Sequence, residues 1–332
     1  MSEFPVPLTK ITLSKSALLH NLNQFKKLAP KASFAPVLKS NAYGHGLVQI
    51  AKILDDQDIS FLVLNSLDET LVLRQNKIKS KILIMGYSLL ENISGSKLKN
   101  TSFTLTDIDS IRKLAKNLKH PTRFHLKIDT GMSRQGILED DFDEVVSLIK
   151  SNKNIILEGL FSHLAESEKP NSSLTKTQIK RWNVFSVRFK KEFHSIKYFH
   201  LTNTSGTYFV KNLGVNMARL GLGLYGISEG QGEFPLKLRK AKFGRPATAG
   251  LAEISETNYL KLKPVLEMTS ILTNIKKIKK GEKVGYNGTF TAKKDMTITT
   301  VPVGYFEGVD RRLSNTGYFL VNKIPCPIIG KI

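Results

Sequence analysis

The chain has 332 residues, of which 41% are hydrophobic and 23% charged, a composition typical of a soluble globular protein with one large or two smaller domains. No apolar run reaches the length of a bilayer span, so an integral membrane protein is not expected. The formal net charge of +22 would suit a nucleic-acid partner, but the lysines are scattered and no nucleic-acid-binding motif accompanies them, so we expect no such partner.

Two features of the sequence indicate a cytoplasmic protein. The first 20 residues contain no apolar core followed by a cleavage site, so we expect no signal peptide. Cys326 is the sole cysteine, so no intrachain disulfide can form, and a reduced compartment is the natural setting.

The first predicted elements are a short strand, LTKITL over residues 8–13, and a helix directly after it. Ser14 is placed to cap this helix, whose apolar face would consist of Leu18, Leu22 and Phe25. The strand stands apart from the pattern that follows, and it is a candidate to pair with the β domain at the other end of the chain.

Eight apolar, β-rich segments then alternate with helix-like stretches such as residues 107–119 and 141–150. This alternation predicts a (β/α)8 barrel, with an open doubly wound sheet as the competing fold. The eight segments are residues 33–39, 60–65, 81–87, 101–107, 123–129, 157–164, 198–203 and 217–226.

From about Leu260 onward the pattern consists of β segments alone, which predicts a small all-β domain. We therefore predict a barrel domain over residues 1–240 and a C-terminal β domain over residues 241–332. Residues 227–260 would form a linker or an insertion. The predicted β segments are residues 264–278, 282–290, 296–305 and 318–329.

Polar and ionisable residues stand at the C-terminal ends of the predicted barrel strands, where the active sites of such barrels lie. Each alone would be an ordinary strand end, but several at one mouth predict an active site. Lys39 has two interpretations, because a lysine that closes a strand can simply reach water, whereas one held among apolar neighbours can become a nucleophile. The residues at these positions are Lys39, Lys127, Asp129, His163, His200, Asn203 and Arg219.

Several motifs follow one another in an order found in one enzyme family. They are PVLKSNAYGHG (36–46), KIDTGMSRQG (127–136), LEGLFSHLA (157–165), YFHLTNTSGT (198–207), NMARLGLGLYG (216–226), LKPVLEMTS (262–270), KKGEKVGYNGTFTA (279–292) and VPVGYFEG (301–308). Together they resemble the alanine racemases, pyridoxal 5'-phosphate (PLP) enzymes with a barrel and a β domain. The resemblance covers nearly the whole chain and implies an isomerase that supplies D-alanine for peptidoglycan.

The resemblance implies a PLP site at the barrel mouth. Lys39 would bind PLP as a Schiff base, and Arg219 would contact the pyridine nitrogen. The residues implied to bind the phosphate are Tyr43, Thr204, Gly221 and Leu222, the last two through their backbone. Two further residues implied at the cofactor site are His163 and Asn203.

The resemblance also implies a homodimer with shared active sites. Tyr286 would be the second catalytic base and would reach into the barrel of the other subunit, where Tyr305 would line the substrate entrance. Arg134 would lie near the ring hydroxyl of PLP and the substrate carboxylate. Lys127 matches a lysine that is often carbamylated, and His200 would support the site. No metal is implied.

The chemistry of racemisation agrees with a mechanism that uses two bases. Racemisation removes a proton from one face of Cα and returns it to the other, which a single base cannot easily do. A tyrosine is a poor base at its ordinary pKa of about 10, so Tyr286 would need a network such as His163 and Arg219. Because a guanidinium keeps its protons, Arg219 would leave the pyridine nitrogen unprotonated and so favour simple proton return over transamination.

Other interpretations remain open at this stage. A broader amino-acid racemase, acting on serine or a basic amino acid, would use the same bases. A PLP-carrier protein of the single-barrel type would share the lysine motif but lack the β domain, so residues 264–332 argue against it. The family pattern continues past Ile332 with a Cys-Met-Asp segment, so we expect the chain to be truncated and its β domain incomplete.

Overall fold

The computed structural model describes residues 6–169, 171–227 and 260–332. The predicted boundary after residue 240 and most of the predicted linker lie outside these residues. The described residues divide into two compact units, one with residues 14–227 and 260–265, the other with residues 6–13 and 266–332.

The first unit confirms the predicted (β/α)8 barrel. Each of the eight predicted segments overlaps a parallel strand, although the strands are shorter than the apolar runs, and β6 and β7 begin one and two residues before their predicted starts. They are β2 (Ser33–Pro36), β3 (Leu62–Leu64), β4 (Ile82–Ile84), β5 (Thr101–Leu105), β6 (Thr122–Lys127), β7 (Ile155–Phe161), β8 (Tyr198–His200) and β9 (Met217–Leu220).

Backbone hydrogen bonds close these strands into a ring. Strands β3 to β8 pair in sequence order, and β2 pairs in parallel with β9. A parallel bridge between Val37 and Val63 joins β2 to β3. The Arg219 amide donates to the Thr202 carbonyl at 3.1 Å, which joins the ends of β8 and β9. The ring therefore brings the C-terminal ends of all eight strands to one mouth.

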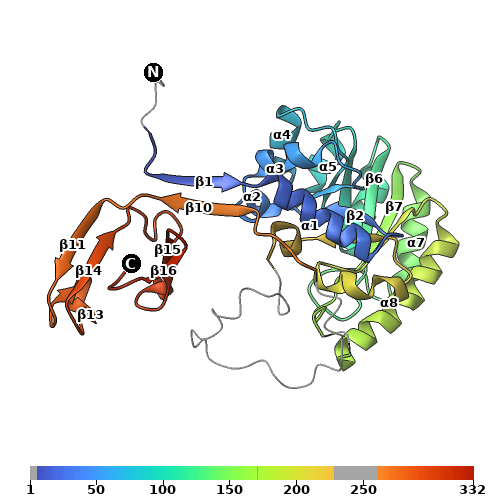
Figure 1. Cartoon of the computed structure of the whole chain (residues 1–332). Helices are drawn as coiled ribbons and strands as arrows, with labels where there is room; N and C mark the ends of the chain where they lie inside the picture. The colour runs from blue at the N-terminus through green and yellow to red at the C-terminus, as the bar shows by residue number, and fades with distance from the viewer. Residues whose placement is uncertain (1–5, 170, 228–259) are drawn as a thin grey trace. The chain divides into compact units, whose positions relative to one another are not determined.

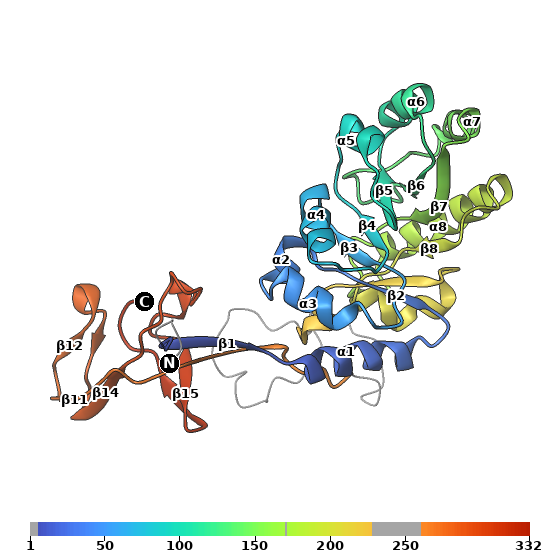
Figure 2. The ribbon, with the colours of Figure 1, turned by 90° about the horizontal axis from the view of Figure 1, so that it is seen from above.

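Helices surround the strands (Figure 1), and Figure 2 shows α4 to α7 following one another around the outside. The first helix begins as predicted, because the Ser14 side chain accepts from the Ala17 amide and Leu18, Leu22 and Phe25 are buried. The helices are α1 (Lys15–Leu28), α2 (Lys39–Tyr43), α3 (Leu47–Leu54), α4 (Leu67–Gln75), α5 (Leu90–Gly95), α6 (Ile108–Asn117), α7 (Phe142–Ser151) and α8 (Ser173–Glu192), with 3-10 turns η1 (Ser205–Asn212) and η2 (Leu222–Tyr225).

The barrel interior has an apolar side and a polar side. The apolar side is a cluster that includes Ala35, Val63 and Leu83 on β2 to β4. On β6, β8 and β9, buried ionisable side chains take inward places, because inward positions alternate along each strand. These side chains are His125 and Lys127 on β6, His200 on β8 and Arg219 on β9.

The second unit consists of antiparallel strand pairs. The predicted N-terminal strand forms β1 (Thr9–Leu13), which pairs with β10 (Leu266–Ser270). The other pairs are β11 (Asn274–Ile278) with β14 (Met296–Thr300), β12 (Lys283–Val284) with β13 (Phe290–Thr291) and β15 (Tyr318–Val321) with β16 (Ile324–Pro327), with 3-10 turns η5 (Tyr286–Gly288) and η6 (Arg311–Leu313). In the described residues, no helix is both long and apolar enough to cross a membrane.

The packing of Gly159 on β7 against His125 can be tested by substitution. A Cβ atom at this position would lie 2.1 Å from Nδ1 of His125. We expect Gly159→Ala to lower the free energy of unfolding by about 1–3 kcal/mol, the usual cost of overpacking a core. Urea unfolding followed by circular dichroism would measure it. Gly95→Ala is the matched control, because the space around Gly95 is open within 4 Å and that change should cost nothing. Equal effects of both changes would contradict the packing described.

Candidate active site

Two hydroxyls and a backbone turn converge at the mouth of the barrel. The Thr204 hydroxyl accepts from the amides of Gly221 and Gly223, each at 3.2 Å. A Cβ atom on Gly221 would lie 3.0 Å from the Tyr43 hydroxyl and 3.8 Å from that of Thr204. Leu222 begins the 3-10 turn η2 beside them. Because the Thr204 oxygen accepts from two amides, its O–H is left to donate, and beside the Tyr43 hydroxyl this makes a site for an anion such as phosphate.

Lys39 lies just past the end of β2, at the first position of α2. Its Nζ is 6.0 Å from the centre of the Tyr43 ring, so the predicted lysine and one predicted phosphate ligand are neighbours. Lys39 is exposed in the single chain. One interpretation of Lys39 required that apolar neighbours enclose it, and within the barrel they do not. The buried strand leads to the lysine at the barrel mouth but does not cover it.

The guanidinium of Arg219 is buried and organises its surroundings. One terminal nitrogen donates to Nδ1 of His200 at 2.8 Å and to its carbonyl at 3.0 Å. The other donates to Nδ1 of His163 at 3.1 Å and to the carbonyls of Ser162 and Leu201 at 2.8 and 3.2 Å. The predicted residues Arg219, His163 and His200 therefore form one hydrogen-bonded group.

Arg219 determines where the histidine protons are. A guanidinium can only donate, so Nδ1 of His200 accepts and its proton lies on Nε2. That Nε2 lies 2.8 Å from Nδ1 of His125, which must therefore accept in turn. The Nε2–H of His125 then faces the Glu158 carboxylate across 3.6 Å. A directed chain thus runs through the barrel from a cation at the mouth to a carboxylate, with two neutral imidazoles between them.

Burial and the cationic neighbours shift the pKa values of these groups. Burial, with Arg219 next in importance, lowers the pKa of His163 to about 3 and that of His200 well below its ordinary value. Burial lowers the pKa of Arg219 to about 9, which leaves it cationic at neutral pH. Burial, with Arg134 and Arg219, lowers the pKa of Lys127 to about 8. Neutral imidazoles thus share the site with cations.

Arg134 is exposed on the loop that follows β6. The Asp129 carboxylate folds this loop by accepting from the amides of Gly131, Met132 and Ser133 at 2.8 to 3.1 Å. A parallel bridge between Ile128 and Ile137 returns the loop to the strand end. Asp129, named from sequence as a strand-end residue, therefore shapes the loop that carries Arg134.

Asn203 is not part of the hydrogen-bonded group around Arg219. The Asn203 side chain accepts from the Gly206 amide at 3.0 Å, so its oxygen forms a local hydrogen bond within the segment that follows β8. Tyr286 and Tyr305 belong to the unit of antiparallel strands, where their exposed fractions are 79% and 66%.

Sequence reasoning missed His125 and Glu158. His125 was part of a predicted strand, RFHLKID, but it was not singled out. The signal was present, because Arg123, His125 and Lys127 recur at every second residue and so share one face of β6. A polar repeat on the inward face of a barrel strand indicates that the barrel interior contains a polar network.

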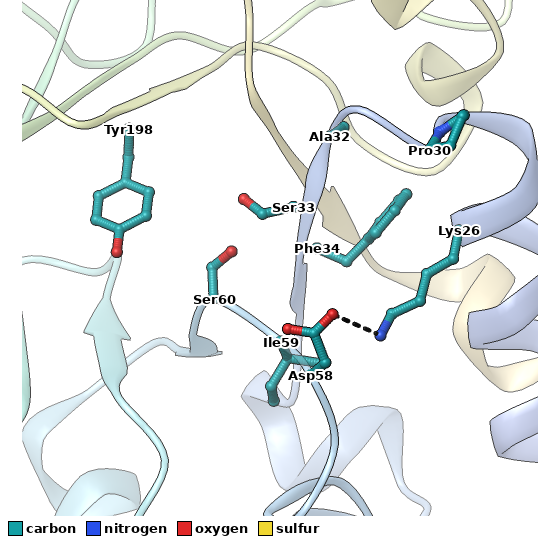
Figure 3. Close-up of a pocket in the computed structure, with 9 residues that line it drawn as sticks. All are labelled: Lys26, Pro30, Ala32, Ser33, Phe34, Asp58, Ile59, Ser60 and Tyr198. Atoms are coloured by element: carbon teal, nitrogen blue, oxygen red, sulfur yellow. Dashed lines mark hydrogen bonds and ion pairs between the residues drawn. The ribbon is translucent and has the colours of Figure 1, made fainter.

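A pocket of about 380 Å³ lies elsewhere in the barrel (Figure 3). Its lining includes Ser33 at the start of β2, Ser60 before β3 and Tyr198 at the start of β8. A Lys26–Asp58 ion pair at 3.4 Å crosses its rim. Because these are the N-terminal ends of strands, the pocket is at the end opposite the predicted site residues and is not the candidate active site.

The buried histidines make stability depend on pH. Burial lowers the pKa of His125, His163 and His200 in the folded state, so below pH 6.5 the unfolded chain binds protons that the folded chain refuses. The free energy of unfolding should therefore fall as pH drops below about 6.5, by up to about 1.4 kcal/mol per pH unit for each histidine. Urea unfolding at pH 7.0 and 5.5 measures this fall. Nitrogen-15 NMR should show neutral Nε2–H rings for His125, His163 and His200 at both pH values, and an imidazolium signal assigned to any of these three at pH 7.0 would contradict these proton positions.

Comparison with known proteins agrees with this geometry. The family models of the alanine racemase N-terminal and C-terminal domains match residues 13–229 and 265–332. An alanine racemase of Borreliella burgdorferi (strain ZS7) is 35% identical over 331 residues, 97% of this chain and 81% of that protein. An alanine racemase structure from Clostridium difficile 630 matches with a TM-score of 0.76 and 28% identity, over 93% of this chain and 76% of that one. A histidine racemase structure from Leuconostoc mesenteroides shares the fold, with a TM-score of 0.78 and 24% identity over 99% and 83% of the two chains. The chain belongs to the alanine racemase family.

Proposed function

We propose that this protein is a cytoplasmic, PLP-dependent alanine racemase that interconverts L- and D-alanine and supplies D-alanine for peptidoglycan. One observation supports this most directly. The lysine, the anion-binding turn and the buried guanidinium lie at one barrel mouth, in the order of the family motifs. The hydroxyls of Tyr43 and Thr204 beside Gly221 suit a phosphate, and Arg219 is a cation that suits a ring nitrogen.

When bound, PLP would supply an electron sink for the charge that develops at Cα. The residues of the chain would bind the cofactor and move the proton. Lys39 Nζ would hold the cofactor covalently until the substrate amine takes its place, and as a free amine it would then accept or return the proton on one face of Cα. Arg219 keeps its protons and so would donate a hydrogen bond to the ring nitrogen rather than a proton. The anion-binding turn would fix the phosphate, and thereby the plane of the ring.

The other face of Cα needs a second base, and we propose Tyr286 of a second subunit. His163 carries its proton on Nε2, because Arg219 occupies Nδ1. This N–H is available to stabilise a tyrosine oxygen that has lost its proton. Tyr286, with 79% of its surface exposed, is free to enter another barrel. The second subunit would also cover Lys39, and Tyr305 would line the substrate entrance.

Lys127 and Arg134 would set the charge near the substrate carboxylate. The pKa of Lys127, lowered to about 8, leaves an appreciable neutral fraction at neutral pH. A neutral amine is the form that takes up carbon dioxide, so this lysine suits carbamylation. The change would replace a cation beside Arg134 by an anion and so hold that guanidinium in place.

The experiment that tests the proposal is chemical labelling of Lys39. Borohydride reduction of the purified protein with PLP should attach the cofactor to the peptide that contains Lys39, and racemisation of L-alanine should be abolished by the same treatment. Lys39→Ala should take up no reducible cofactor, with Lys52→Ala as a control on the neighbouring helix α3. L-serine and L-lysine assayed in parallel would show whether the specificity is broader. Cofactor attached to another lysine in the unchanged protein would contradict the assignment.

Shared active sites predict complementation between two inactive variants. Lys39→Ala lacks the residue that would hold PLP as well as one base, so it should be inactive. Tyr286→Phe lacks the hydroxyl of the other base and should lose about 10²–10⁴-fold of its activity, the usual value of a positioned acid or base. Mixing them should restore activity, because a hybrid dimer contains one site with both groups. Mass spectrometry of mixed dimers serves as the control for subunit exchange. Exchange without recovered activity would show that each subunit uses its own tyrosine.

A further inference from the structure

The residues that follow Lys39 have a rare backbone conformation. Ser40, Asn41, Ala42 and Tyr43 all have positive φ, between 54° and 55°. With ψ values of 44° to 54° at the first three, this is a left-handed helical turn. L-amino acids avoid this conformation because Cβ approaches the next carbonyl oxygen, and they adopt it singly rather than in runs. Four such residues in succession persist only where surrounding contacts hold them.

Hydrogen bonds from inside the loop hold part of this turn. The Ala42 amide donates to the Leu38 carbonyl at 2.8 Å. The Asn41 side chain accepts from the Leu47 amide at 2.8 Å, which ties the turn to the start of α3. The Gly44 amide also donates to the Ser40 carbonyl at 3.2 Å. None of these bonds uses the Ser40 amide, directly after Lys39, so the partner of that amide must come from outside the loop.

That partner is Glu69 on α4. One carboxylate oxygen, Oε1, accepts from the Ser40 amide at 2.7 Å, and the other, Oε2, accepts from the Asn65 amide at 2.8 Å. The carboxylate therefore bridges the C-terminal ends of β2 and β3. A hydrogen bond to a charged acceptor is roughly twice as strong as a neutral one, which suits it to hold an unfavourable conformation.

Helix capping alone does not explain these contacts. Ser66 caps α4 by accepting from the Glu69 amide at 3.2 Å. In a capping box, the glutamate at this position would return to the amide of the capping serine. Here it passes that amide and reaches Asn65 and, 29 residues away in sequence, Ser40. Asn65 is itself tightly packed, since a Cβ atom on Gly86 would lie 2.1 Å from its carbonyl oxygen.

We propose that Glu69 is a positioning residue for Lys39. By holding the Ser40 amide against the end of β3, it keeps the left-handed turn in place, with Lys39 at its start and Tyr43 at its end. The lysine and the phosphate-binding tyrosine thereby keep a constant separation. The functional half of this inference rests on the proposed PLP site, whereas the conformational half does not.

The test compares Glu69→Ala and Glu69→Gln with Asp68→Asn. Asp68 is exposed on the same first turn of α4, so its variant removes the same charge from the helix N-terminus without removing the clamp. In protein without added PLP, hydrogen exchange over residues 39–44 should be about 10- to 100-fold faster in Glu69→Ala, the range expected for loss of hydrogen bonds to a charged group. Exchange in Glu69→Gln should lie between that of Glu69→Ala and that of Asp68→Asn, because glutamine replaces one of the two accepting oxygens by an NH2 group, which can only donate.

The second measurement is uptake of PLP by Lys39, followed by absorbance and by borohydride labelling. Glu69→Ala should weaken PLP binding by about 10-fold or more, while Asp68→Asn should bind as the unchanged protein does. Equal weakening in Asp68→Asn and Glu69→Ala would overturn the inference in favour of a helix-dipole effect. So would exchange that speeds up uniformly across the barrel, or unaltered exchange and PLP uptake in Glu69→Ala. If the unchanged protein itself places no PLP on Lys39, the proposed function fails, and the exchange data still decide whether Glu69 holds the turn.

Discussion

The polar half of the barrel depends on one buried cation, the guanidinium of Arg219. Burying a charge is costly unless hydrogen bonds satisfy it, and here two imidazoles and three backbone carbonyls do so. Since the guanidinium only donates, both histidines that contact it must present lone pairs, which keeps them neutral. The carboxylate of Glu158 lies at the far end of the chain of imidazoles, where it stabilises the proton on His125 without neutralising the cation at the mouth.

This arrangement leaves the barrel mouth strongly positive. Lys39, Lys127, Arg134 and Arg219 contribute charge, and each of them lowers the pKa of His163. A site with several cations and neutral imidazoles attracts a phosphate and a carboxylate together, which an amino-acid substrate on PLP would bring. The same field opposes protonation of His163, so its Nε2–H would remain a simple hydrogen-bond donor while a proton moves between the two faces of Cα.

The mouth also needs a backbone that is held in place. Lys39 stands between a buried strand and a left-handed turn, and neither part can move without a penalty in packing or in backbone conformation. The strand ends are joined across the mouth, β2 to β3 through Glu69 and β8 to β9 through backbone hydrogen bonds. The ring of strands thus positions reactive groups that come from segments far apart in the sequence.

Much of the fold followed from local patterns in the sequence alone. The alternation of apolar and helical segments predicted eight strands, Ser14 predicted the start of α1, and the ordered motifs predicted the family. Such patterns are readable because periodicity and capping depend on neighbouring residues. They also singled out Lys39, Thr204 and Arg219 as candidate site residues, because these stand at strand ends or in motifs.

Contacts across the ring were decided only by the tertiary structure. His125 meets His200, and Glu69 meets Ser40, because strand register and ring closure bring together residues that are 75 and 29 positions apart. The exposure of Lys39 was likewise hidden, since an apolar strand before a lysine does not reveal what covers the lysine itself. The positions of the histidine protons were also decided by the tertiary structure. They follow from Arg219 only once the hydrogen-bond partner of each ring nitrogen is known, and those partners depend on three-dimensional packing rather than on sequence spacing.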